Sequence, residues 1–212
     1  MDAIIDVVAW FERVRGYIPA MMAGDYAKAR KAESGSPLTA CLESLLEHNS
    51  ALWGYEDQVR RPDIPDSEVA LNKRHIDREN QLRNDCIDDA DAALVALLER
   101  NGAQSASLPL LTETPGSAFD RLSIIALRLH HLGLECARKD ATAEHKQRCS
   151  AKMAHVEERS RDLCASLTCY LADVAAGKLR VKSYRQHKLY NDPETNPAVR
   201  AARASGAGQG GR

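Results

Sequence analysis

Polar side chains interrupt the apolar faces of two predicted helices, and their types suit the binding of a charged small molecule. Lys73, Asn80 and Arg83 occupy a row that is otherwise apolar from Val69 to Leu97. A buried polar group costs free energy unless it is paired, so polar residues in such a row either pair with one another or contact a ligand. The preceding helix shows the same change from apolar to polar along Asn49, Trp53, Glu56 and Arg60.

An antiparallel hairpin of these two helices would bring Glu56, Asp57 and Arg60 close to Lys73 and Asp77. Two interpretations remain open. The first is a structural network of buried ion pairs, such as Glu56–Lys73 and a pair between Asp57 and Arg83. The second is a site for a charged ligand, which we favour because a structural ion pair rarely needs amides, a tryptophan and several charges together.

Three further segments could contribute to the same site. Thr114 and Pro115 begin a helix whose free N–H groups and dipole favour an anion, although capping alone also explains both residues. Asp120 and Arg121, one turn later, could orient a substrate hydroxyl or phosphate. The segment from Lys182 to Asn191 combines cations with aromatic rings. This combination suits phosphates and a stacked base or sugar, or equally an arm packed on an acidic bundle.

The predicted site draws on all these segments. Catalytic roles, as a base or a metal ligand, are predicted for Glu56, Asp57 and Asp85. Substrate contacts are predicted for Trp53, Arg60, Lys73, Asp77, Asn80, Arg83, Asn84, Thr114, Asp120, Arg121, Tyr184, Arg185 and Lys188. His130, His131 and His145 are weaker candidates for acid–base work, since the first two are neighbours and cannot face the same side.

Asp85, Asp88 and Asp91 are spaced by three along the long third helix. This spacing places carboxylates where oxygen ligands could converge on Mg²⁺ or Mn²⁺, with Glu56 and Asp57 as further ligands. A solvated acidic face explains the same residues equally well, so the use of a metal stays open.

Hydrophobic spacing predicts five helices that position these groups. They cover about residues 2–15, 36–61, 66–101, 114–136 and 140–177, with Ser36, Asp66, Thr114 and Asp140 as N-caps. A short helix is indicated near residues 26–32, and residues 178–190 form either a short helix or an extended arm. We therefore expect an all-α fold with a single domain over residues 1–200, a helical bundle with a basic C-terminal arm. A disordered Gly/Ala/Ser-rich tail over residues 201–212 follows it.

Composition narrows the classes of function. The net charge of −1 gives no overall attraction to nucleic acid or membrane, although residues 177–212 carry eight Lys and Arg against Asp192 and Glu194, a net +6 that leaves −7 for the rest. No apolar run approaches the roughly 18 residues of a membrane span, and the first residues lack the basic segment of a signal peptide. The six cysteines form no CxxC pair, so we expect reduced, mostly buried thiols in a cytoplasmic protein.

The polar strings together resemble an uncharacterised bacterial family, domain of unknown function 4254. The resemblance runs from about Leu42 to Arg200 and implies an intracellular, mostly helical protein without an established reaction. Gly54 departs from the pattern, because relatives often have His beside the tryptophan. The resemblance is carried by Leu52-Trp53, Glu56-Asp57, Lys73, Ile76-Asp77, Asn80-Gln81, Arg83-Asn84-Asp85, Thr114-Pro115, Asp120-Arg121, Tyr184-Arg185 and the run Lys188 to Pro193.

We expect a cytoplasmic enzyme that acts on a phosphorylated or nucleotide-activated small molecule of the sugar type. Its reaction would be hydrolysis or group transfer. The alternative is a non-catalytic helical binding or assembly module whose polar network fixes the helix register. A homodimer is compatible with either expectation. Nucleic-acid binding ranks last, because the basic C-terminal stretch is short and the rest of the chain is acidic, and no membrane partner is expected.

Overall fold

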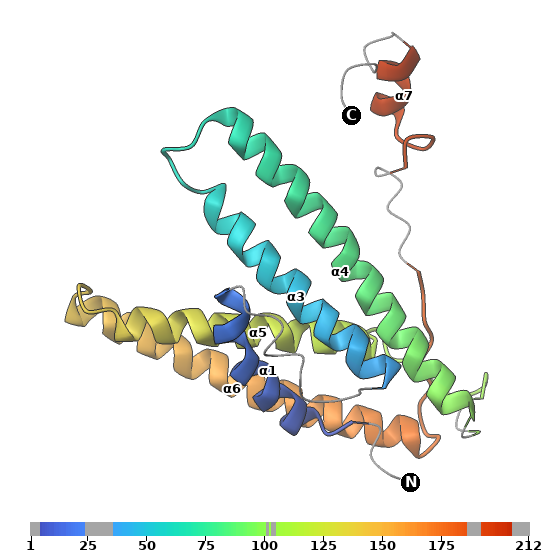
Figure 1. The fold of residues 1–212 in the computed structure, drawn as a ribbon. Coiled ribbons are helices and arrows are strands. Elements are labelled where there is room, and N and C mark those ends of the chain that lie inside the picture. Colours follow the sequence, from blue (N-terminus) through green and yellow to red (C-terminus); the bar gives the residue numbers. More distant parts are fainter. Residues whose placement is uncertain (1–4, 24–35, 101, 103–104, 186–191, 205–212) are drawn as a thin grey trace.

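The computed structural model describes residues 5–23, 36–100, 102, 105–185 and 192–204. Over these residues the chain is all-α, as expected (Figure 1). The helices are α1 Val7–Met22, α3 Pro37–Gln58, α4 Asp66–Arg100, α5 Pro115–Ala137, α6 Ala143–Ala175 and α7 Pro197–Ala204.

Helix α5 is the centre of the fold, because it packs against α1, α3, α4 and α6. The chain forms two long hairpins, α3–α4 and α5–α6, and α1 contacts both of them. Figure 1 shows that the hairpins lie close together near the start of α5 and diverge toward the α3–α4 turn and the α5–α6 turn. This arrangement leaves the outer half of α3 and α4 extending past the core.

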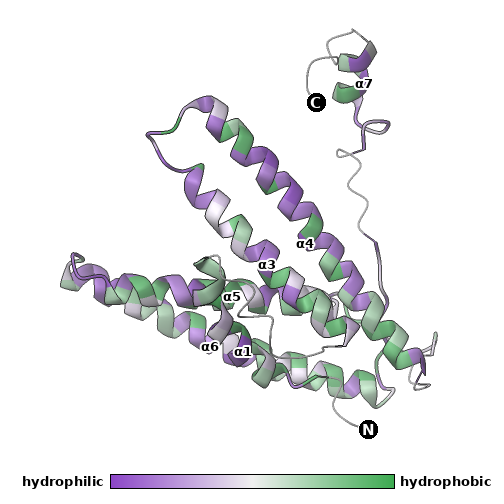
Figure 2. Cartoon of the chain, in the orientation of Figure 1, coloured by the Kyte–Doolittle hydropathy of each residue, from purple (hydrophilic) through white to green (hydrophobic). Residues whose placement is uncertain are grey.

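The core is continuous along α1 and the inner halves of the hairpins. Its largest fully buried side chains include Ile18, Leu42, Leu94, Phe119 and Leu167. On α4, by contrast, only Ile76 is buried between residues 66 and 85, and Figure 2 shows that this half of the helix is mostly hydrophilic. The projecting part of the α3–α4 hairpin is therefore held mainly by contacts between its own two helices.

Two such contacts lie on facing turns of the hairpin. His48 Nδ1 lies 2.7 Å from Glu79 Oε2, and the rings of Tyr55 and His75 stack with their centroids 4.9 Å apart. Pairs of this kind fix the register of the two helices where little apolar surface is buried.

Helix starts follow local side-chain chemistry, and three predicted starts are wrong. Asp66 is the first residue of α4 and not its N-cap, because the Pro65 carbonyl accepts the first helical hydrogen bonds, from Glu68 N at 2.9 Å and Val69 N at 3.1 Å. Ser36 and Thr114 accept hydrogen bonds from Thr39 N at 3.3 Å and Ser117 N at 3.3 Å, each with a proline at the next position, as predicted. The cap of α6 is Thr142 and not Asp140, because its hydroxyl receives His145 N at 3.2 Å.

The first helix was also predicted wrongly over residues 2–15. It begins after Asp6, whose carboxylate accepts Ala9 N at 2.9 Å, and it continues through Pro19 to Met22. Proline removes one backbone donor, but Ile18 and Met21 are buried on the core side of the same helix. Their burial outweighs the local preference for a break at this position.

After a turn and bend at residues 176–179, the chain continues without helix to residue 185, and Leu110 and Arg180 form an isolated parallel bridge. Asn196 caps α7 by accepting Ala198 N at 3.0 Å. Helix α7 runs to Ala204, so the first residues of the expected tail are helical. The helix indicated near residues 26–32 and the rest of the tail lie outside the described residues.

None of the described helices has the length and apolar composition needed to cross a bilayer. The described cysteines are all free thiols. Cys149 and Cys164 are buried and Cys169 is exposed, so the expectation of mostly buried cysteines holds for only part of the set.

Candidate functional site

A cavity of about 340 Å³ opens between α3, α4 and α5. Helix α4 contributes Asn80 and Arg83, and α5 contributes Ile124 and Leu127. One face of α3 provides most of the remaining wall, and the turn that follows it adds Arg60; the residues from α3 are Asn49, Leu52, Trp53, Glu56 and Asp57. The cavity lies where the two hairpins begin to diverge, and its walls are partly polar and partly apolar.

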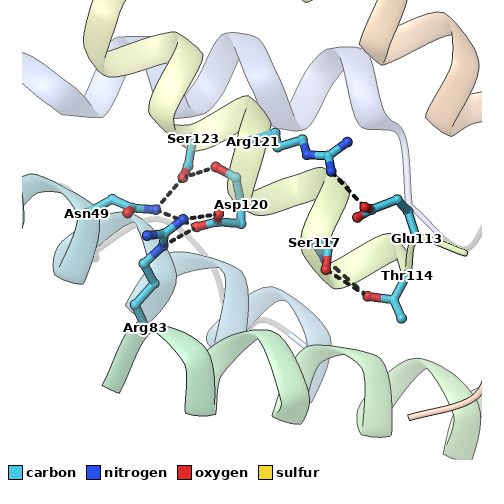
Figure 3. A network of polar contacts seen from close by, with 8 residues as sticks. All are labelled: Asn49, Arg83, Glu113, Thr114, Ser117, Asp120, Arg121 and Ser123. Carbon is cyan, nitrogen blue, oxygen red and sulfur yellow. Dashed lines mark hydrogen bonds and ion pairs between the residues drawn. The ribbon is translucent and has the colours of Figure 1, made fainter. Parts of the chain in front are cut away.

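The buried carboxylate of Asp120 joins the three helices below this cavity (Figure 3). Arg83 donates to it through two nitrogens, Nε at 2.8 Å and Nη2. Asn49 Nδ2 donates to the same carboxylate at 2.9 Å and to Ser123 Oγ at 2.7 Å, and Ser123 Oγ donates to the Asp120 carbonyl at 2.8 Å. The side chain of Asp120 is 6% exposed, so the bonds from Asn49 are buried, whereas those from Arg83 are partly buried.

Arg83 is held rigidly by this arrangement. The bidentate bond to Asp120 raises the pKa of the Arg83 guanidinium above its ordinary value. Its side chain is 25% exposed and lines the cavity, and Nη1 makes no hydrogen bond with the described residues. Arg83 therefore keeps donors for a ligand while its position is set by Asp120.

The two carboxylates in the cavity wall differ in their surroundings. Glu56 is paired with Arg60 one turn away, at 2.5 Å between Oε2 and Nη1. The Asp57 carboxylate is exposed and forms no hydrogen bond or ion pair with the part of the chain that the structure describes. Asp57 is thus the carboxylate of this wall that remains available for proton transfer.

An aromatic pair bounds the cavity on its outer side. The rings of Trp53 and His131 stack with centroids 4.2 Å apart and planes 5° apart. Burial lowers the pKa of His131 below its ordinary value, with a smaller effect from His130, while Asp57 acts in the opposite direction. His131 Nε2 is buried and has no hydrogen-bond partner among the described residues.

A second polar contact, between α4 and α5, lies outside the cavity. Asp91 Oδ1 accepts Gly116 N at 2.7 Å at the start of α5. A Cβ at Gly116 would lie 2.7 Å from the Ile87 carbonyl oxygen, so the helices approach here as closely as a glycine allows. Burial raises the pKa of Asp91 to about 6, against the opposing effect of hydrogen bonds from Thr114 and Gly116.

The structure does not bring Asp85, Asp88 and Asp91, the possible metal ligands of α4, together at one site. Asp91 is buried and turned to the start of α5, whereas Asp85 is exposed and accepts Gln81 Nε2 at 2.8 Å. Among the described residues, no group of three or more His, Cys, Asp or Glu side chains has an arrangement that could hold a metal ion.

Comparison with known proteins identifies a family but indicates no activity. A family model described as "Protein of unknown function (DUF4254)" matches residues 39–183. The chain belongs to this family. The matched range contains every residue that lines the cavity, together with Asp120, and it excludes α1 and α7. No curated protein and no solved structure matches the chain.

In this DUF4254 protein, one part of the predicted site is found together in space. The cavity wall includes Trp53, Glu56, Asp57, Arg60, Asn80 and Arg83, and Asp120 lies directly behind Arg83. These residues come from α3 and the turn after it, from α4 and from α5, in agreement with the predicted site among those helices.

The remaining predicted residues lie elsewhere. Lys73 is exposed and bonds Asp77, because at that turn of α4 the row of residues no longer faces the core. Arg121 points away from the cavity and pairs with Glu113 at 2.9 Å (Figure 3). The cavity wall does not include Asn84, Asp85, Thr114, Tyr184 or Arg185, and Lys188 lies outside the described residues.

The predicted ion pairs are wrong as well. Glu56 pairs with Arg60 in place of Lys73, and Arg83 pairs with Asp120 in place of Asp57. Local spacing explains the first difference, since residues four apart on a helix are neighbours. The second arises because α5 lies across the hairpin and presents a carboxylate to the inner face of α4.

Two contributors were not predicted as site residues. Asn49 belongs to the polar row of α3, and its spacing of seven from Glu56 was a usable signal. Ser123 carries no such signal, because a serine three residues after Asp120 is ordinary in a helix and its role depends on the approach of α3.

Proposed function

We propose that the cavity between α3, α4 and α5 binds a phosphorylated, sugar-type small molecule and supports its hydrolysis or group transfer. The proposal depends chiefly on Arg83, a cavity-lining guanidinium that Asp120 and Asn49 hold in place while leaving it free donors. A planar guanidinium fixed beforehand binds a phosphate oxygen without the cost of ordering a long side chain.

The other cavity residues favour a ligand that carries more than a phosphate. Glu56, Asp57 and Asp120 outnumber Arg60 and Arg83 by one charge, so phosphate binding depends on the free donors of Arg83 and not on a net positive potential. Amide and carboxylate groups are suited to hydroxyl groups, and the half-buried ring of Trp53 offers a flat apolar face. A sugar phosphate or sugar nucleotide presents both kinds of group.

In this reaction Asp57 would act as the general base. The oxygen of water or of an acceptor hydroxyl attacks the substrate and forms a new bond to it. The proton of this attacking group passes to the Asp57 carboxylate. The leaving oxygen departs with the electron pair of the broken bond and takes a proton from solvent. Arg83 and Arg60 would stabilise the negative charge on the phosphate oxygens in the transition state.

The test compares two neighbouring arginine sites by isothermal titration calorimetry. Glucose 1-phosphate, UDP-glucose and glucose would each be titrated into the wild-type protein and into the Arg83→Gln and Arg121→Gln variants. We expect binding of a phosphorylated compound but not of glucose, a loss of about tenfold or more in Arg83→Gln, and no change in Arg121→Gln. Equal affinities in the two folded variants would contradict the proposal.

Activity is tested separately through Asp57. Asp57→Asn should retain affinity for the phosphorylated compound and lose most of its turnover, because the amide cannot accept the proton. Asp77→Asn, which alters an exposed carboxylate paired with Lys73, is the matched control. Turnover that is unchanged in Asp57→Asn would exclude this base.

The structure also favours a second candidate, the helical binding or assembly module. The bonds of Asp120 are all made by protein groups, so the network is complete without a ligand. On this alternative no phosphorylated compound raises the melting temperature of the wild-type protein.

A further inference from the structure

A second hollow, of about 490 Å³, lies between α5 and α6 beside the stacked Trp53–His131 pair. Leu132 and Val156 line it from the two helices. Four long polar side chains also line the hollow: Arg128, Glu135, Lys152 and His155. The surface inside the hollow is nevertheless almost entirely carbon. The polar ends of these side chains therefore point outward while their carbon stems cover the floor.

This hollow continues from the polar cavity along α5. Ile124 and Leu127 line the polar cavity, and Arg128, His131 and Glu135 line the apolar hollow. The spacing of three and four places these residues on one face of α5, over a length of about 16 Å. Trp53 belongs to both linings, so its ring lies at the boundary between the polar space and the apolar one.

The two linings differ in the chemistry they can accept. The polar cavity offers guanidinium, amide and carboxylate groups, and the adjoining hollow offers carbon surface with two cationic side chains, Arg128 and Lys152, at its edge. Apolar surface of this extent, placed directly beside a polar site, is suited to the hydrocarbon part of a ligand whose polar head occupies that site.

We infer that the ligand is a phosphorylated amphiphile. Its phosphate-bearing head group binds at Arg83, and its hydrocarbon chain passes Trp53 and lies between α5 and α6 on Leu132 and Val156. This inference rests on the proposed function and adds the class of substrate. The stacked imidazole of His131, whose pKa is lowered by burial, forms the wall that the chain passes.

The experiment uses ethyl phosphate and octyl phosphate as probes, with octyl glucoside as a chain that lacks the phosphate, all kept below the concentrations at which they aggregate. Affinities are measured by calorimetry with the wild-type protein and with Leu132→Asn. Leu134→Asn is the matched control, because Leu134 lies two residues away, is 53% exposed and does not line the hollow. Sedimentation at each ligand concentration monitors the oligomeric state.

We expect octyl phosphate to bind about tenfold or more tightly than ethyl phosphate, since burying part of its chain removes apolar surface from water. Leu132→Asn should abolish most of that gain and leave the ethyl phosphate affinity unchanged, and Leu134→Asn should preserve the gain. The emission of Trp53, read in the Trp10→Phe protein, should change with octyl phosphate.

Failure of this inference is distinguishable from failure of the proposed function. Equal affinities for ethyl and octyl phosphate, or a gain that survives Leu132→Asn, would overturn the amphiphile and leave the phosphate site standing. Formation of a dimer that covers the hollow and prevents the gain in affinity for octyl phosphate would likewise overturn the amphiphile and leave the phosphate site standing. Octyl glucoside binding as tightly as octyl phosphate would overturn the proposed function itself, because the phosphate would then contribute nothing.

Discussion

Replacing Asp120 with asparagine tests the polar network below the cavity. The change keeps the shape of the side chain but removes the charge that two nitrogens of Arg83 and one of Asn49 contact. It leaves a cation that is only 25% exposed without its partner. Breaking a buried ion pair typically costs 3–5 kcal/mol, and the partial exposure of Arg83 places the expected loss near the lower end, at about 3 kcal/mol.

For a chain of this size a loss of about 3 kcal/mol corresponds to a fall of roughly 6–12 °C in Tm. Urea unfolding followed by circular dichroism would measure the free energy of unfolding for Asp120→Asn, Arg83→Met and the double variant. Because the double variant contains neither unpaired charge, it should be more stable than the sum of the two losses implies, by about 2 kcal/mol.

The control cycle uses Glu113 and Arg121, a pair whose side chains are 54% and 47% exposed. Its coupling should stay below about 1 kcal/mol, as is usual for exposed ion pairs. An Asp120→Asn protein as stable as the wild type, or equal couplings in the two cycles, would refute the idea that the Asp120 network joins the three helices.

Two further predictions concern the contact between α4 and α5. Because the pKa of Asp91 is raised to about 6 in the folded protein, from about 3.9 when unfolded, its stabilising effect is fully present below pH 4 and is lost as the pH rises through 6. The stability of Asp91→Asn relative to wild type should therefore rise by up to about 3 kcal/mol between pH 4 and pH 8. Urea unfolding at each pH measures this, and a difference in stability that does not change with pH would contradict the prediction. Gly116→Ala should lose about 1–3 kcal/mol, because its Cβ would meet the Ile87 carbonyl oxygen at 2.7 Å. Gly133→Ala should gain about 0.5–1 kcal/mol of stability, because its Cβ would have nothing within 4 Å. Equal thermal shifts for the two variants would show that the close approach of the helices at Gly116 is absent.

The helices could be predicted well where capping and periodicity agree. Ser36 with Pro37 and Thr114 with Pro115 mark the starts of α3 and α5, and the length of α4 follows from its row of apolar residues. Prediction failed where local and tertiary effects compete. Pro19 indicated a break, but the burial of the residues around it in the core keeps α1 helical.

The candidate site could be predicted only within one hairpin. The polar row on α3 and the pair Asn80 and Arg83 on α4 do face a common cavity, because the hairpin geometry follows from the periodicity of its two helices. The crossing of α5 has no signature in the sequence, so the partner of Arg83 was assigned to Asp57 instead of Asp120. Lys73 was placed inside because its row was extended past the point where the core ends.

The most direct test of the central claim is a crystal structure grown with tungstate, a phosphate analogue whose position is visible by anomalous scattering. The account predicts an anomalous peak in the cavity, within hydrogen-bond distance of the Arg83 guanidinium, that disappears in Arg83→Gln crystals and persists in Arg121→Gln crystals. A cavity without tungstate while ions bind at other surfaces of the same crystals, or a peak that survives Arg83→Gln, would contradict the claim that this cavity is a phosphate-binding site.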